Sequence, residues 1–284
     1  MLKALLCCGL ILPLNPLAAP RTGNSAGVAR THEQGQSVVS QAGSILALGS
    51  MEVFEAALVD ALGIAQVNNP SVVILPQASS EEDSGLEEKR AFEAMGISDV
   101  YILKDLSQEG SKDLLRLASV VWLAQGSPQK LMRKLAADNL ASFLPRLNGQ
   151  GLIIGGAGRV AGALGIGFIE GNIKPPLMTS LSVMPNRGVG LWNGFVVPCM
   201  DEDTRLIEGI TACLDQPNRP AIYFNHGSSI RIDGDNMYFW GSGSTLFLDA
   251  RTAKKSLTEP KQSISIQDVK LHSFTEGDTF TWFK

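Results

Sequence analysis

The sequence is short of the residues that build metal sites. Its 284 residues include three histidines and four cysteines. The histidines, His32, His226 and His272, stand far apart along the chain, whereas a zinc site needs His, Cys or carboxylate ligands at close spacing. One acidic run, Asp201-Glu202-Asp203, precedes a predicted helix, where negative side chains commonly complement the helix dipole. The sequence therefore predicts no metal site.

Clustered positive charge and long apolar runs are also scarce. The 24 Lys and Arg residues are fewer than the 28 Asp and Glu residues, which gives a net charge of −4. No basic stripe with interleaved aromatic side chains occurs, so nucleic acid is not expected as a partner. Beyond the N-terminus no segment approaches the roughly 18 uninterrupted apolar residues of a membrane-spanning helix. We therefore expect no stable membrane span.

The N-terminal segment has the features of a targeting signal. Lys3 precedes an apolar stretch over 4–14, and the small residues Leu17-Ala18-Ala19 follow. This pattern predicts a secretory signal peptide over 1–19 and a secreted or periplasmic protein. A buried N-terminal stretch, or a lipid anchor on one of the two early cysteines, is the alternative.

Apolar side chains are abundant, at 44% of the sequence against 18% charged residues, which suffices for a sizeable core. Short apolar runs alternate with helical patterns in the first half of the chain. They predict strands over 44–48, 71–75, 100–103, 120–123 and 152–154, and helices over 52–66, 81–95, 111–117 and 129–144. Such alternation indicates a mainly parallel sheet covered on both faces, with function at the carboxyl ends of its strands.

The second half of the chain follows a different pattern. It predicts a helix over 203–214 and short strands over 221–224, 229–232, 237–240 and 245–248, after an apolar segment over 191–197. The turns Gly234-Asp235-Asn236 and Gly241-Ser242-Gly243 indicate two hairpins. We predict an α/β fold: a three-layer sandwich with a mainly parallel central sheet and C-terminal antiparallel hairpins. It would comprise a flexible lead-in over 20–43, one domain over 44–250 and a partly mobile tail over 251–284.

A glycine-rich turn over 154–163 follows the last of the parallel strands. Its glycines do not keep the spacing of a dinucleotide site, and the ending of a phosphate loop is absent, so no nucleotide cofactor is expected. The spacing does fit a nucleophile elbow, a tight strand-to-helix turn that lifts one side chain above the sheet. Its central residue is Val160, which has no nucleophilic group, and no Ser, Thr or Cys occurs between Leu152 and Gly171.

Several short motifs follow one another in a set order between residues 44 and 249. They are Leu48-Gly49-Ser50-Met51-Glu52, Leu75-Pro76-Gln77-Ala78-Ser79-Ser80, Ala124-Gln125-Gly126-Ser127-Pro128-Gln129, Gly158-Arg159-Val160-Ala161-Gly162-Ala163, Gly188-Val189-Gly190-Leu191, Gly227-Ser228-Ser229-Ile230 and Gly241-Ser242-Gly243. In this order they resemble the cyanophycinase and dipeptidase E group of serine peptidases. The resemblance implies a fold related to the glutamine-amidotransferase-like α/β sandwich.

The resemblance also implies that the catalytic positions are replaced. The nucleophilic serine of the family falls on Val160, its histidine near Cys199-Met200, and the acidic residue of its Asp-Glu-Gly turn on His226. A hydrolase of this type needs a hydroxyl, a base and a group that orients the base. We therefore expect no catalytic residue, and an exported protein that has lost hydrolase activity. It would bind a peptide or a small amino-acid-like ligand in the remnant pocket, and it could form a homodimer. The expected binding residues are Gly126, Ser127, Gln129, Arg159, Val160, Ala161 and His226.

Cys199 and His226 leave an alternative open. A Cys199 thiolate paired with His226 would make an active peptidase or cyanophycinase-type hydrolase with a non-standard site. Cys199 could equally fill apolar space or form a disulfide with Cys213, and His226 could be a hydrogen-bonded turn residue. Arg159 would bind a ligand carboxylate if it faced the pocket, and otherwise would face solvent.

Overall fold

The computed structural model describes residues 42–169, 186–198, 203–256 and 265–282. The predicted signal peptide, nearly all of the lead-in, and Cys199, Asp201 and Glu202 lie outside these residues.

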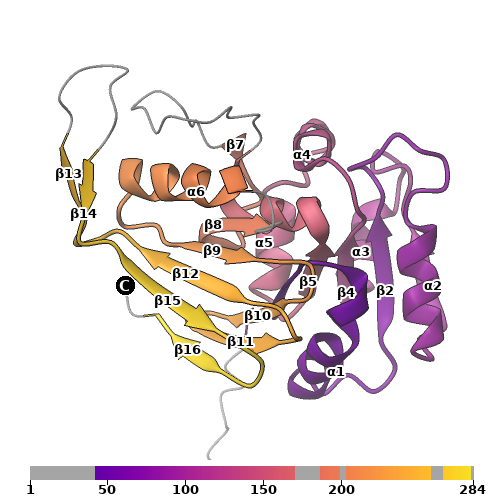
Figure 1. Ribbon diagram of the computed structural model, residues 1–284. Coiled ribbons are helices and arrows are strands. Elements are labelled where there is room, and N and C mark those ends of the chain that lie inside the picture. Colours follow the sequence, from indigo (N-terminus) through magenta and orange to yellow (C-terminus); the bar gives the residue numbers. More distant parts are fainter. Residues whose placement is uncertain (1–41, 170–185, 199–202, 257–264, 283–284) are drawn as a thin grey trace, which may run out of the picture. The chain divides into compact units, whose positions relative to one another are not determined.

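The first half of the chain forms the parallel part of an eight-stranded sheet (Figure 1). Its parallel strands are β1 (Ile45–Leu48), β5 (Ile153–Ala157), β4 (Val120–Leu123), β2 (Ser71–Leu75) and β3 (Asp99–Ile102), in that spatial order. Antiparallel strands β10 (Ser229–Asp233), β11 (Asn236–Trp240) and β16 (Thr279–Thr281) extend the sheet beyond β1. Four of these short apolar runs are thus buried parallel strands, because both faces of the sheet are covered there. The fifth forms β3 at the edge of the sheet, where the side chains are partly exposed.

A second sheet of six strands packs against part of the first. Its spatial order is β15 (Lys270–Phe274), β12 (Thr245–Asp249), β9 (Ala221–Phe224), β8 (Trp192–Pro198), β6 (Gly165–Phe168) and β7 (Asn186–Arg187). Strands β13 (Lys254–Ser256) and β14 (Ser265–Gln267) form a separate pair. The α/β class, with a parallel sheet and C-terminal antiparallel strands, is confirmed, and the division of the strands into two large sheets adds to it.

One of the two predicted hairpins is wrong. β10 and β11 form the expected hairpin at Gly234, but Gly241-Ser242-Gly243 carries the chain from β11 in the first sheet to β12 in the second. The chain also crosses between the sheets from β9 to β10. The two crossings touch, since the amide N–H of Gly243 donates to Gly227 O at 2.9 Å. The glycines therefore serve a crossing between sheets rather than a tight turn within one sheet.

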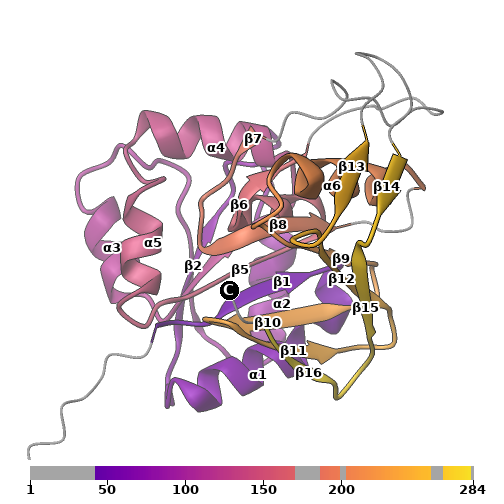
Figure 2. The same ribbon diagram turned by 90° about the vertical axis from the view of Figure 1, so that its left-hand side faces the viewer.

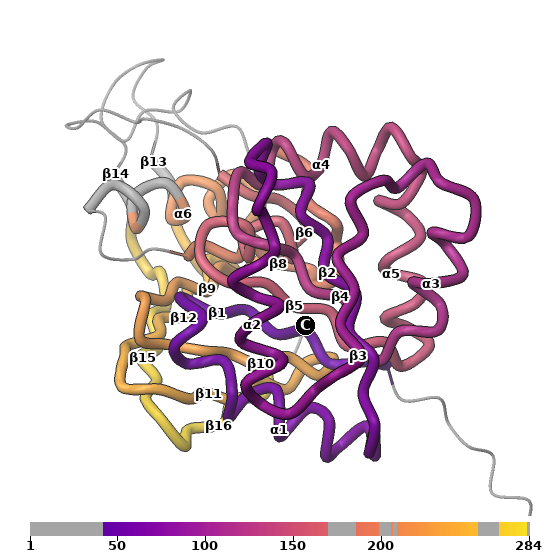
Figure 3. Tube along the Cα trace, turned by 90° about the vertical axis from the view of Figure 1, so that its right-hand side faces the viewer, coloured from indigo at the N-terminus to yellow at the C-terminus, as the bar shows by residue number. Residues whose placement is uncertain are grey.

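Alternate side chains of the parallel strands enter separate cores. Leu46, Val72 and Trp122 lie in one core with residues of α1 (Phe54–Ile64) and α2 (Leu86–Ala94). Figure 3 shows these two helices beside the parallel strands. Val73 and Val121 lie in another core with residues of α3 (Ser111–Leu117), α4 (Pro128–Ala137), α5 (Phe143–Asn148) and the second sheet. Figure 2 shows where these three helices lie. This alternation follows from the two-residue period of a strand. A third core lies between the second sheet and α6 (Asp203–Asp215).

The single helix predicted over 129–144 is two helices. α4 starts at Pro128, behind Ser127, whose hydroxyl accepts a hydrogen bond from the amide N–H of Lys130 at 3.3 Å. It ends where Asn139 adopts φ +56°, a left-handed conformation that asparagine tolerates better than most residues. The chain then turns into α5.

The described part of the tail belongs to the sheets. β15 pairs with β12 and β16 pairs with β11. Trp282 is buried and packs near Phe247, and Phe274 stacks on Phe239 with ring centroids 4.5 Å apart. Trp282 and Phe274 therefore contribute to the core of the preceding domain.

Candidate functional site

Four segments meet at the carboxyl ends of the strands. They are Gly49-Ser50 after β1, Gln125-Gly126 after β4, Gly158 after β5 and Asn225-His226 after β9. Ser50 Oγ donates to His226 O at 2.9 Å. A Cβ placed on Gly158 would lie 3.9 Å from Gly49 O and 4.0 Å from Gln125 Cδ. The edge that parallel α/β sheets use for function thus brings together segments far apart in the sequence.

The close approach of β1 and β9 requires glycine at residue 49. A Cβ on Gly49 would overlap the carbonyl group of Asn225. The amide N–H of Gly49 donates to Ser228 O at 2.8 Å, and Ser228 Oγ donates to Asn225 Oδ1 at 2.9 Å. These bonds fix the turn that carries His226.

The tip of the bend after β5 is Gly158, not Val160 as we expected. Gly158 has φ +64° and begins the 3₁₀ helix η2 (Gly158–Leu164). Val160 lies two residues further along, is fully buried, and belongs to the core between the sheets. A Cβ on Gly156 would lie 3.3 Å from Val160 Cγ1. The prediction failed because several glycines in this segment allow the elbow pattern to be placed in more than one register. In either register the residue has no nucleophilic side chain.

The turn after β4 packs tightly against the end of β2. Gly126 has φ +150°, and a Cβ there would overlap Ala78 O. The amide N–H of Ser127 donates to Ala78 O at 2.9 Å. Gly126 and Ser127 thus contribute backbone to this edge.

Glu88 is a site residue that the sequence analysis missed. Its side chain is buried on α2, and its Oε1 accepts a hydrogen bond from the amide N–H of Gln125 at 2.8 Å. A buried carboxylate needs such a partner because desolvation of its charge is costly. The signal was available: Glu88 and Phe92 are one helical turn apart and are the buried residues of α2. Glu88 therefore positions the main chain of the β4 turn.

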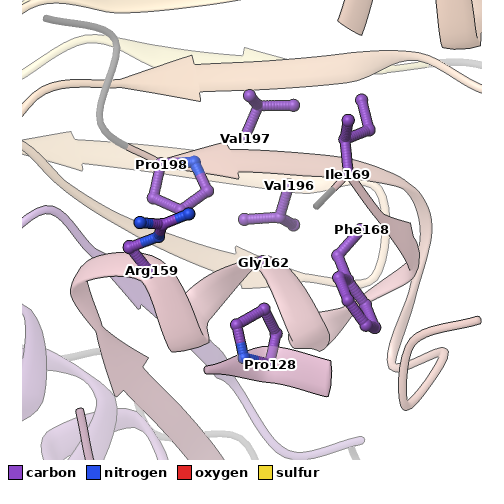
Figure 4. A pocket seen from close by; sticks show the side chains of 8 residues that line it. All are labelled: Pro128, Arg159, Gly162, Phe168, Ile169, Val196, Val197 and Pro198. Atoms are coloured by element: carbon purple, nitrogen blue, oxygen red, sulfur yellow. The ribbon is translucent and has the colours of Figure 1, made fainter. Parts of the chain in front are cut away.

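Arg159 lines a small cavity behind the bend. Pro128, Gly162, Phe168 and Pro198 are among its lining residues, and Arg159 lies beside Pro198 (Figure 4). The volume open to the centre of a water molecule is about 20 Å³, which is room for about one water. Ala161 itself is buried in the core. Arg159 is exposed and makes no ion pair with any described residue.

His226 and Gln129 are the remaining predicted binding residues. His226 is exposed at the strand ends, and its ring makes no hydrogen bond within the described residues. Gln129 lies apart from the bend, because its Oε1 accepts a hydrogen bond from Arg133 Nη2 at 2.6 Å and faces a different groove. The structure thus groups Gly126, Gly158 and His226 and separates them from Gln129 and Val160.

Of the two residues in the cysteine-histidine alternative, the structure describes only His226. Cys199 lies outside the described residues, so its distance from His226 stays a prediction. Cys213 on α6 is a free thiol, and burial raises its pKa well above the ordinary range. Such a thiol is inert.

The described residues form neither a candidate metal cluster nor a helix that could span a membrane. No group of three or more His, Cys, Asp or Glu side chains there could hold a metal ion. None of the helices in that part of the chain is long and apolar enough to cross a membrane.

Comparison with known proteins identifies the fold. No protein-family model and no curated protein matches the sequence. Solved structures do. A peptidase from an acI-B1 Actinobacterium superposes with a TM-score of 0.60 at 19% identity, covering 86% of this chain and 98% of that one. A protein from Listeria monocytogenes EGD-e, assigned as a peptidase E, gives 0.50 at 13% identity, with 70% and 98% covered. The chain therefore has a peptidase E-like α/β fold, as the motif resemblance implied.

Proposed function

We propose that this chain is a peptidase E-like protein without hydrolase activity, which binds a peptide or a small amino-acid-like ligand at the strand-end site. One observation carries the proposal: the left-handed residue at the bend after β5 is a glycine. Covalent peptide hydrolysis begins with a hydroxyl or thiol at such a bend. Removing the nucleophile from a triad lowers the rate by about six powers of ten.

The geometry around Gly158 supports a retained binding function. A Cβ on Gly158 would make only ordinary van der Waals contacts, with Gly49 O and Gln125 Cδ, so no other side chain fills the place of the missing nucleophile. The buried carboxylate of Glu88 still orders the β4 turn. Arg159, next to the bend, has no carboxylate partner within the described residues, and a guanidinium recognises a carboxylate through two parallel hydrogen bonds. Export through the predicted signal peptide is part of the same proposal.

Two measurements on the purified chain test the proposal. We expect no hydrolysis of an aspartyl-arginine polymer or of acidic dipeptides, and a rise in melting temperature with at least one acidic dipeptide. Arg159→Gln should abolish that rise. Lys112→Gln, which removes an exposed positive charge from α3, should leave it unchanged.

Turnover would contradict the loss of activity. If Cys199→Ala or His226→Ala abolished that turnover, the active site would be the cysteine-histidine alternative. If no dipeptide stabilised the protein, or if Lys112→Gln weakened binding as much as Arg159→Gln, the binding half of the proposal would be wrong.

A further inference from the structure

A second groove lies beside α4, away from the bend at Gly158. Its walls come from α4, from the turn between α4 and α5, and from β6 and β7 with the loop that follows β7. The groove has a volume of about 550 Å³. Sites for small organic ligands commonly enclose about 300–1,000 Å³. The groove is therefore large enough for a ligand of several atoms.

α4 presents one side-chain stripe to the core and another to this groove. Pro128, Leu131 and Leu135 are its buried residues. Gln129, Met132, Arg133 and Ala136 line the groove, and their spacing of i, i+3, i+4 and i+7 places them on one face of the helix. Met132 is partly buried against the core as well as lining the groove. The second stripe therefore combines an apolar surface with a positive charge.

A second arginine of the groove is carried by a fixed main chain. Arg187 is opposite Gly167 in the β6–β7 pair. The following residues are tied to the same sheet region, because Gly188 N–H donates to Ile166 O at 3.0 Å and Val189 N–H donates to Ala163 O at 2.7 Å. The backbone that carries Arg187 is therefore held in place.

Among the described residues, the charged side chains that line the groove are positive. They are Arg133 and Arg187, and no Asp or Glu stands among the described lining residues. Arg133 Nη2 donates to Gln129 Oε1, which orients the guanidinium, and within the described residues neither arginine pairs with a carboxylate. Phe168 and Val189 also line the groove, although both side chains are largely buried. In a chain with net charge −4, two arginines in one groove match a negatively charged ligand.

We propose that this groove binds a small organic anion: a carboxylate or phosphate group on an apolar body. The two guanidiniums would hold the oxygen atoms of the anion, and the apolar part would pack between Met132 and Phe168. The proposal does not depend on the function proposed for the strand-end site, because it uses a different set of side chains.

Binding of two anions of different origin tests the proposal. Phenyl phosphate and 3-phenylpropanoate are titrated into the full chain at constant ionic strength, with 3-phenylpropanol as the neutral control. We expect at least one anion to bind more tightly than the alcohol. Arg133→Gln or Arg187→Gln should weaken that binding about tenfold, the usual effect of losing a charge-assisted hydrogen bond.

Lys134→Gln is the matched control, because it removes the same charge from an exposed position of α4 that does not line the groove. It should change the dissociation constant less than twofold. The anion that binds more tightly identifies the source as phosphate or carboxylate. Three results would each overturn the proposal: no binding of either anion at millimolar concentration, equal binding of the alcohol, or equal weakening by Lys134→Gln.

Discussion

Gly158 and Gly155 lie three residues apart but are constrained for different reasons. Gly158 has φ +64° and a Cβ there would make only ordinary van der Waals contacts, whereas a Cβ on Gly155 would lie 2.5 Å from Trp122 Cζ3. Gly158→Ala should lower the free energy of unfolding by about 1 kcal/mol, the cost of a left-handed alanine. Gly155→Ala should cost about 1–3 kcal/mol because it overpacks the core. Urea unfolding of both variants checks the order, and a larger loss at Gly158 would show that the space before the bend is filled.

Glu88 offers a second residue-scale prediction. Glu88→Met removes the acceptor of the partly buried Gln125 amide N–H and should destabilise the protein by about 0.5–1.5 kcal/mol, the usual net contribution of a hydrogen bond. Glu88→Gln keeps an acceptor oxygen and should cost less. The checks are urea unfolding and hydrogen exchange of the Gln125 amide, which should speed up in Glu88→Met alone. Equal exchange in the two variants would mean that this bond does not order the β4 turn.

The sequence predicts the part of the candidate site that follows directly from where a strand ends, and it does not predict the rest. Gly126 lies at the strand-end edge because the apolar run over 120–123 fixes where β4 ends; its role in binding stays a prediction. Val160 was misplaced by two residues, since nothing in the sequence says which of Gly156, Gly158 and Gly162 adopts positive φ. The sequence analysis does not predict Glu88 as a site residue, because it is one of several acidic residues in a charged helix. Its spacing from Phe92 nevertheless places it on the buried face of α2.

At the scale of elements, the strands of the tail depend on long-range pairing and not on a local sequence pattern. β15 and β16 fill out sheets whose other strands come from far earlier in the chain. Trp282→Ala should lower the free energy of unfolding by about 3–5 kcal/mol, as large-to-small changes in a core do. Leu271→Ala on β15, where the side chain is 55% exposed, should stay within about 0.5 kcal/mol. Urea unfolding compares the two, and equal small effects would show that the tail is not part of the core.

The strands themselves follow from short apolar runs, which is local information. Their assignment to two sheets does not, because it depends on where the chain crosses between sheets. The crossings at Gly227 and Gly241 use the same turn-forming residues that a hairpin uses. A sequence pattern over ten residues cannot distinguish a hairpin turn from a crossing between sheets. The hydrogen bond between the Gly227 and Gly243 segments is a long-range contact that such a pattern does not contain.

At the scale of the whole molecule, the lowered pKa values of Asp249 and Asp105 link the free energy of unfolding to pH. Burial acts to raise the pKa of Asp249, but the side-chain and backbone hydrogen bonds from Arg251 and its positive charge outweigh burial and lower that pKa. Asp105 also has a lowered pKa, chiefly because the Ser107 hydroxyl and amide donate to it. A carboxyl whose pKa is lowered on folding stabilises the protein above its unfolded pKa of about 3.9, and this stabilisation is lost as the pH falls through the folded value.

The free energy of unfolding should therefore receive a constant contribution from these groups near neutral pH and lose it below about pH 4. Asp249→Asn cannot titrate at this position, so its stability relative to the parent chain should recover as the pH falls. Asp99→Asn removes an exposed carboxyl on β3 and should keep the pH dependence of the parent chain. Urea unfolding at pH 6 and pH 3 compares the three proteins. If Asp249→Asn lost as much stability between these pH values as the parent chain, the Asp249–Arg251 pair would not control acid stability. The loss would then come from the overall gain of positive charge as the remaining carboxyls take up protons.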